Sequence, residues 1–214
     1  MKHAAVIFSL EGTLLDTLED LTSVVNKTLK GAGYPEKTKE EIAKGVGNNM
    51  GELIRAVVPK GTTWEESYDL IAPCYEEYAN SNTGSTKPYD GVLDLLKTLQ
   101  KEGVKVAVIS NKPEQTAIDL CKTALDDCVS VVLGAKDEIK GLPAPDLIFA
   151  AAKELDVPLF KVLAVGNTKA DVQAARNAGV DGVAVSWGFK SRTALENQSA
   201  KVIVDTPAEL LELI

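Results

Sequence analysis

Short apolar runs recur along most of the chain and alternate with segments of helical periodicity. The first run, Ala4–Phe8, is continuously apolar, which is typical of a buried strand in a parallel sheet. Five further runs have the same character: Val104–Ile109, Val129–Leu133, Val162–Val165, Gly182–Val185 and Val202–Val204. Between them, apolar residues fall at i, i+3, i+4 and i+7, as in Val92, Leu95, Leu96 and Leu99, which predicts helices with one buried face. This alternation predicts an α/β fold, a Rossmann-like parallel sheet with helices on both faces.

The segment from about Asp16 to Thr83 interrupts this alternation, because its apolar residues follow helical spacing and no convincing strand pattern appears. We therefore predict two domains. The α/β core takes residues 1–15 and 84–214, and a helical cap domain formed by residues 16–83 is inserted between the first and second strands. The polar, turn-rich stretch from Asn80 to Thr86 is the expected return linker.

Composition and charge narrow the possible partners. The 214 residues are 45% hydrophobic and 25% charged, as in ordinary globular proteins, and the net charge of -8 disfavours a nucleic acid or an anionic membrane as partner. The first apolar run stops at Ser9, too early for a secretory signal, and no stretch approaches the ~18 apolar residues of a membrane span. We expect a cytoplasmic monomer or small homo-oligomer.

Cysteine and histidine usage excludes several kinds of site. Three cysteines without a C-x-x-C spacing argue against a disulfide framework or a zinc site. His3 is the only histidine, which disfavours a histidine-based catalytic triad and a multi-histidine metal site.

Polar residues gather where the predicted strands end. In open parallel sheets, ligands bind outside the carboxyl ends of the strands. Four segments are expected at that edge: S-L-E-G-T-L-L-D-T from Ser9, S-N-K-P from Ser110, K-G-L-P-A-P-D from Lys140, and G-N-T-K-A-D from Gly166.

These four segments, in this order, resemble the motifs of the haloacid dehalogenase superfamily. In that family the first strand ends in D-x-D-G-T, the second ends in Ser or Thr, a Lys-Pro-x-Pro segment follows, and the fourth ends in G-D-x-x-x-D. The stretch V-G-N-N-M-G-E-L-I-R-A, from Val46 to Ala56, is similar to phosphoglycolate phosphatases, as is the tail from Ser186 onward. The resemblance covers nearly the whole chain and implies a Mg²⁺-dependent phosphomonoester hydrolase.

The resemblance also assigns roles to the motif positions. The first Asp of the family attacks phosphorus, and the second Asp is the general acid and base. The Ser or Thr and the Lys hold the phosphoryl oxygens, and the acidic pair after the fourth strand helps to bind Mg²⁺. A carboxylate becomes a competent nucleophile once the repulsion of the phosphate is offset by Mg²⁺ and Lys.

This chain departs from the family at four of those positions. Ser9 replaces the nucleophile, Glu11 replaces the acid/base, Leu142 replaces the Lys, and Asn167 replaces one metal-binding Asp; Ser110 and Asp171 match. A serine hydroxyl is a weak nucleophile without an activating base, and Mg²⁺ prefers carboxylate oxygens. We therefore predict weak or absent Mg²⁺ binding at Asn167 and Asp171, and impaired phosphatase activity.

Some capacity to bind anions is expected to remain. The candidate contacts are Gly12, Thr13, Ser110, Asn111 and Lys112, which offer backbone N–H groups, hydroxyls, an amide and a cation. A small anionic or phosphorylated molecule is the expected partner.

Two other functions stay open. One is a working hydrolase with altered chemistry, in which Ser9 or a water is activated by Glu11 as base; the other is a structural or interaction protein. Each residue also has a plainer interpretation: a tight turn for Ser9 to Thr13, and a favourable first-turn charge for Asp171.

Overall fold

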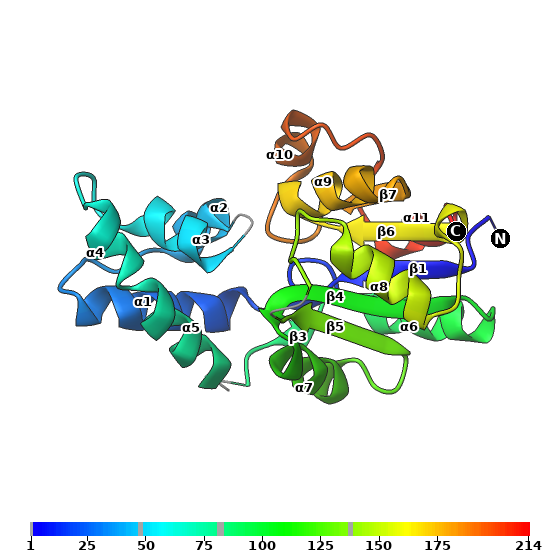
Figure 1. Cartoon of the computed structure of the whole chain (residues 1–214), viewed down its shortest axis with the longest axis horizontal. Coiled ribbons are helices and arrows are strands. Elements are labelled where there is room, and N and C mark those ends of the chain that lie inside the picture. The colour runs from blue at the N-terminus through cyan, green and yellow to red at the C-terminus, as the bar shows by residue number, and fades with distance from the viewer. Residues whose placement is uncertain (1, 47–48, 81–83, 137–138) are drawn as a thin grey trace. The chain divides into compact units, whose positions relative to one another are not determined.

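The computed structural model describes residues 2–46, 49–80, 84–136 and 139–214. Two compact units divide the chain, and the longer is formed by residues 1–16 with residues 87–214. The other unit takes residues 17–86. The chain therefore enters and leaves the second unit between the first and second strands of a larger α/β unit (Figure 1).

A six-stranded sheet forms the centre of the larger unit, in the order β5-β4-β1-β6-β7-β8 (Figure 1). Its strands are β1 (Ala5–Ser9), β4 (Lys105–Pro113), β5 (Val131–Ala135), β6 (Val162–Gly166), β7 (Asp181–Val185) and β8 (Ile203–Val204). Every neighbouring pair runs parallel. The predicted α/β fold with a parallel sheet is confirmed.

Both faces of this sheet are buried. Along β1, Ala5 and Ile7 pack into one apolar cluster, and Val6 and Phe8 pack into another, because successive side chains of a strand point to opposite faces. This double burial explains why β1 is continuously apolar instead of alternating.

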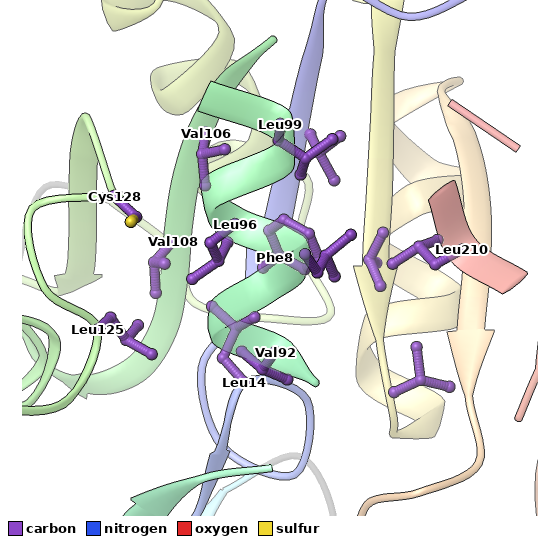
Figure 2. Close-up of a cluster of buried hydrophobic side chains, with 14 of the residues drawn as sticks. Phe8, Leu14, Val92, Leu96, Leu99, Val106, Val108, Leu125, Cys128 and Leu210 are labelled. Atoms are coloured by element: carbon purple, nitrogen blue, oxygen red, sulfur yellow. The ribbon is translucent and has the colours of Figure 1, made fainter. Parts of the chain in front are cut away.

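The helices of this unit are α6 (Val92–Lys101), α7 (Glu114–Ala124), α8 (Asp146–Glu154), α9 (Lys169–Ala178), α10 (Arg192–Asn197) and α11 (Pro207–Leu211), with a 3-10 turn η1 (Leu159–Lys161). On the face of Phe8, α6 lays Val92, Leu96 and Leu99 against the strands (Figure 2). On the face of Ile7, α8 and α9 supply the covering residues.

The smaller unit is helical: α1 (Leu18–Gly31), α2 (Lys39–Gly45), α3 (Met50–Val57), α4 (Trp64–Tyr68) and α5 (Ile71–Asn80). Its own core includes Val25, Leu29, Ile42 and Ile54, all essentially buried. The capping boxes that begin α2 and α4 are set by Thr38 and Thr63. Among the residues that the structure describes, no helix combines the length and apolar character needed to cross a bilayer.

One small element was not predicted. An antiparallel ribbon joins β2 (Leu15–Asp16) to β3 (Lys87–Pro88), where the chain leaves and re-enters the α/β unit. Two-residue strands have no periodicity that a sequence pattern can detect.

Candidate functional site

The carboxyl ends of β1, β4 and β6 bring the predicted motif segments together. Strand β1 lies between β4 and β6, and Ser9 at its end is aligned with Ile109, one residue before Ser110. Strand β6 ends at Gly166, directly before Asn167. The topology therefore places Ser9, Ser110 and Asn167 at one edge of the sheet, as the sequence predicts.

The turn after β1 is closed by its own backbone. The amide of Gly12 donates to the Leu15 carbonyl at 2.9 Å, and Gly12 has a φ of +70°, a conformation that favours glycine. A Cβ on Gly12 would lie 2.8 Å from the ring of Phe189. The Thr13 side chain is fully buried, and the backbone carbonyl of Thr13 accepts a hydrogen bond from Trp187 Nε1 at 2.8 Å. The Thr13 hydroxyl is buried and has no hydrogen-bond partner among the described residues.

Ser9 lies beside Asp171. It is almost entirely buried, with 9% of the residue exposed, and its hydroxyl is close enough to lower the pKa of the Asp171 carboxyl. The pair joins the end of β1 to the first turn of α9.

Asp171 also begins α9. Its carboxylate Oδ2 accepts hydrogen bonds from the Thr168 amide at 2.8 Å and the Asn167 amide at 3.1 Å, and Thr168 completes a capping box. Burial raises the pKa of the Asp171 carboxyl, and the hydrogen bonds from Thr168, Ser9 and Asn167 act in the opposite direction. Asp171 therefore acts as a capping residue in the first turn of α9, which is the plainer of the interpretations that the sequence allowed.

Asn167 is fully buried and ties down the segment after β7. Its amide nitrogen donates to the carbonyls of Val185 and Lys190, the latter at 3.1 Å. Its amide oxygen accepts from the Lys190 amide at 2.8 Å. Only an amide side chain offers this combination, because a carboxylate at this position has no hydrogen to donate.

The segment fixed by Asn167 lies close to the turn after β1. A Cβ on Gly188 would fall 1.7 Å from the Gly12 carbonyl oxygen and 2.6 Å from Asn167 Cγ, so only glycine fits. This segment, residues 186–190, is the main part of the site that sequence reasoning did not assign. The segment contributes mainly backbone groups to the site, and backbone carbonyls cannot be recognised from the identity of a residue. The available signal in the sequence was Gly188, which stands between Trp187 and Phe189.

A buried ion pair occupies the β4 side of the site. Lys112, with a side chain only 5% exposed, places Nζ 3.3 Å from Glu11 Oε1. The nearby Tyr89 hydroxyl has a raised pKa, because of burial first and then the negative charges of Asp16 and Glu11. Lys112 therefore brings one positive charge into a region with several acidic groups, and Glu11 partly neutralises it.

Asn111 holds the segment that precedes α8. Its side-chain amide donates to the Leu142 carbonyl at 3.0 Å and accepts from the Leu142 amide at 2.7 Å. The Leu142 side chain is buried in the apolar cluster on the Ile7 face. Ser110 accepts a hydrogen bond from the Lys112 amide at 3.1 Å through Oγ. Asn111 thus acts as a backbone clamp, a role that the sequence did not suggest.

The side-chain oxygen atoms at Ser9, Glu11, Asn167 and Asp171 are not arranged as ligands for Mg²⁺. Mg²⁺ prefers several hard oxygen ligands in octahedral geometry. Here Asn167 turns its amide groups to backbone partners, Ser9 lies beside Asp171, and Glu11 pairs with Lys112. The described residues contain no group of three or more His, Cys, Asp or Glu side chains placed to hold a metal ion.

Comparisons with known proteins agree with the fold and motif order. Residues 6–185 match the family model of haloacid dehalogenase-like hydrolases. Phosphoglycolate phosphatase 1 of Pseudomonas aeruginosa is 30% identical over 212 residues, covering 96% of this chain and 78% of that protein. The phosphoglycolate phosphatase of Chromobacterium violaceum is 30% identical over 223 residues, covering 100% of this chain and 98% of that protein.

A solved structure of a Lactobacillus delbrueckii subsp. bulgaricus protein superposes on this chain with a TM-score of 0.94. The two sequences are 34% identical, and the alignment covers 100% of this chain and 99% of the other. The chain belongs to the haloacid dehalogenase-like hydrolases and is similar to their phosphoglycolate phosphatases.

Proposed function

We propose that this chain is a phosphoglycolate-phosphatase-like protein with impaired phosphatase chemistry, and that it binds a small anionic or phosphorylated molecule. The observation that carries the proposal is the set of partners at the four substituted positions. Ser9 lies beside Asp171, Glu11 pairs with Lys112, Leu142 is buried among apolar side chains, and Asn167 holds a backbone segment. Each substituted side chain has a structural use that differs from phosphoryl transfer.

The loss of activity follows from chemistry as well as geometry. A serine hydroxyl is a weak nucleophile unless a base takes its proton, and the phosphoryl charge needs cations around it. Leu142 stands in place of the family's lysine and carries no positive charge. The oxygen atoms at Asn167 and Asp171 do not fit Mg²⁺ as ligands. Residues that act as one catalytic unit are not additive in their loss, so the combined effect is near-complete loss of turnover.

The anion would bind beside Lys112 and Ser110. Lys112 is a buried cation at the edge of the sheet, and Ser110 lies two residues before it. Glu11 competes for the same charge at 3.3 Å, which keeps the affinity low. Binding would be independent of Mg²⁺, because the donors at Asn167 and Asp171 are engaged with protein partners.

The test of activity is phosphate release from a panel of small phosphomonoesters, phosphoglycolate included, with Mg²⁺ and with a chelator. The control is Glu11→Gln, which keeps the size of the side chain and removes its charge. We expect no release above that control. Metal-dependent release that Glu11→Gln abolishes would overturn the proposal.

The test of binding is calorimetric titration with inorganic phosphate in the presence of a chelator. Lys112→Gln should abolish binding, and Lys122→Gln, an exposed lysine on α7, should leave it unchanged. Equal binding by the two variants would remove Lys112 from the proposed site.

A working hydrolase with Glu11 as base is the second candidate, and the buried Lys112 beside Glu11 favours it, because a cation there can stabilise developing negative charge. The contact between Ser9 and Asp171 argues against Glu11 as the base for Ser9. A Glu11→Gln variant that retains full hydrolytic activity would sink this mechanism.

A further inference from the structure

Glu11 covers the lysine on which the proposed anion position depends. The Lys112 side chain is only 5% exposed and the Glu11 side chain is 23% exposed, and Lys112 Nζ lies 3.3 Å from Glu11 Oε1. Of the two charged groups, Glu11 is therefore the one that faces solvent. A dissolved anion has to take the place of the Glu11 carboxylate to contact the ammonium group of Lys112.

A displaced Glu11 carboxylate would stay close to the anion that displaced it. The backbone of residue 11 is fixed, because Glu11 forms a bridge with Leu15 in the turn that the Gly12 amide closes at 2.9 Å. Only the side chain can move, by rotation about its own bonds. The negative charge of Glu11 therefore continues to act on a ligand at Lys112.

A second carboxylate lies in the same neighbourhood. The negative charges of both Asp16 and Glu11 act on the buried Tyr89 hydroxyl, after burial itself, to raise its pKa. The half-buried Lys190 belongs to the segment that Asn167 holds on the other side of β1, after β6. An anion beside Lys112 thus meets one ammonium group and the repulsion of nearby carboxylates.

We infer that Glu11 selects the ligand of this site by charge. The position beside Lys112 accepts a monoanion, such as a phosphodiester, a sulfonate or a carboxylate, and disfavours a dianion such as a phosphomonoester. A monoanion replaces the charge of Glu11 at the ammonium group by an equal charge. A dianion adds a further negative charge beside Glu11 and Asp16, and the repulsion grows in proportion to the charge of the ligand.

This inference rests on the proposed function, because it requires an anion beside Lys112, and it narrows the ligand to one charge class. Sulfate and methanesulfonate are the probes, since both have oxygens arranged around a tetrahedral sulfur and they carry two charges and one charge at neutral pH. Each is titrated into the full chain at equal ionic strength, and NMR follows the backbone amides of Ser110 and Lys112. We expect methanesulfonate to bind the parent chain more tightly than sulfate. Equal or tighter binding of sulfate would overturn the inference.

Glu11→Gln removes the charge and nearly keeps the size of the side chain. Its affinity should rise about threefold for methanesulfonate and about tenfold for sulfate, because a repulsion worth a factor of about three per ligand charge counts twice for the dianion. Equal gains for the two anions would contradict selection by charge. The NMR spectra also report whether the variant is folded.

Two further variants separate the charge of Glu11 from its length and from the net charge of the chain. Glu11→Asp keeps the charge on a shorter side chain and should keep the preference for methanesulfonate. Glu102→Gln changes the net charge as Glu11→Gln does, at an exposed position three residues before β4 begins, whereas Lys112 lies near the other end of that strand. It should bind both anions as the parent chain does. Selection by Glu11 would be refuted if Glu11→Asp lost the preference, or if Glu102→Gln gained as much for sulfate as Glu11→Gln.

Failure of the proposed function has a different signature. If neither anion shifts the amides of Ser110 and Lys112, in the parent chain or in Glu11→Gln, no anion binds beside Lys112 and both proposals are wrong. Saturable binding without the preference for one charge overturns the selection by Glu11 and leaves the anion position in place.

Discussion

The two faces of the central sheet are packed with side chains of different size. On one face, Phe8 of β1 is surrounded by Leu96 and Leu99 of α6 and by further leucine and valine side chains, as Figure 2 shows. On the other face, α9 presents alanines, and a cavity of about 260 Å³ remains. The strands share in this difference, because Ala5, Ala107 and Ala164 face α8 and α9, whereas the neighbouring Val6, Val108 and Val165 face α6.

The density of side-chain packing on each face bears directly on stability. A close-packed face holds little space, and each methylene removed from it leaves a void that costs free energy. The face covered by α9 has shorter side chains and leaves some space unfilled beside that helix. The substituted site lies at the carboxyl edge, where Ser9 and Asp171 line the same cavity.

Truncating one leucine on each face gives the largest expected contrast. Leu96→Ala should lower the free energy of unfolding by about 3–5 kcal/mol, because Leu96 is fully buried in the dense cluster. Leu142→Ala should cost less, about 2 kcal/mol, because Leu142 borders a cavity and has fewer neighbouring atoms to lose. Urea denaturation of both variants measures the difference. Equal costs would mean that the two faces are equally well packed.

The two asparagine clamps offer a second contrast. Asn167→Asp should lower stability by about 3 kcal/mol, because it places a carboxylate against the carbonyls of Val185 and Lys190. Asn111→Asp keeps the oxygen that accepts from the Leu142 amide and loses a single donor, so about 1 kcal/mol is expected. Thermal and urea unfolding check both values.

The Asn167→Asp variant also probes the metal position. Added Mg²⁺ should leave the melting temperature of the parent chain unchanged. A rise in the melting temperature of the parent chain with Mg²⁺ would contradict the conclusion that the side chains at this position do not fit the ion.

Enlarging one buried alanine on each face gives a smaller contrast. Ala117→Leu in α7 should destabilise the dense face by about 1–3 kcal/mol, since extra methylenes there force neighbouring side chains to move. Ala174 borders the pocket beneath α9, so Ala174→Leu should cost less than Ala117→Leu. Both positions are helical and fully buried, so helix propensity cancels between them. The comparison fails if Ala174→Leu is the more destabilising change.

The smallest effect is expected away from both faces, at the amino end of β7. The hydrogen bonds from Lys2 and then His3 lower the pKa of Asp181. A carboxylate with a lowered folded-state pKa contributes stability above its unfolded pKa and loses it as pH falls. The difference in melting temperature between the parent chain and Asp181→Asn should therefore shrink between pH 6 and pH 3, around the acid range of an aspartate. A difference that grows as pH falls would contradict the assigned partners.

Much of the fold follows from local pattern. Continuous apolar runs such as Ala4–Phe8 predict buried strands, and each of the six predicted runs overlaps a strand of the sheet. The order of the motif segments also predicts that Ser9, Ser110 and Asn167 meet at one edge, because the carboxyl ends of parallel strands lie together. The two-residue ribbon of β2 and β3 was not predicted, since it pairs Leu15 with Pro88 and Asp16 with Lys87, which are remote in the chain, and it has no local signal.

The roles of individual site residues depended more on the tertiary structure. Asn111 was predicted to contact an anion, and in the structure its side chain holds the Leu142 backbone. Thr13 was predicted at the same site and has a buried side chain. The Asn111 contact could not be foreseen, because the backbone that the fold brings beside a side chain has no signature in the sequence.

The sequence by itself determined the alternation of strands and helices, the edge where the motifs meet, and the loss of carboxylates at two motif positions. These features depend on residue identity and on local periodicity. Only the tertiary structure decided that Asn167 bonds to Val185 and Lys190, that Glu11 pairs with Lys112, and that a cavity lies beneath α9. Those outcomes depend on distances between segments remote in the chain, which close packing fixes and composition does not.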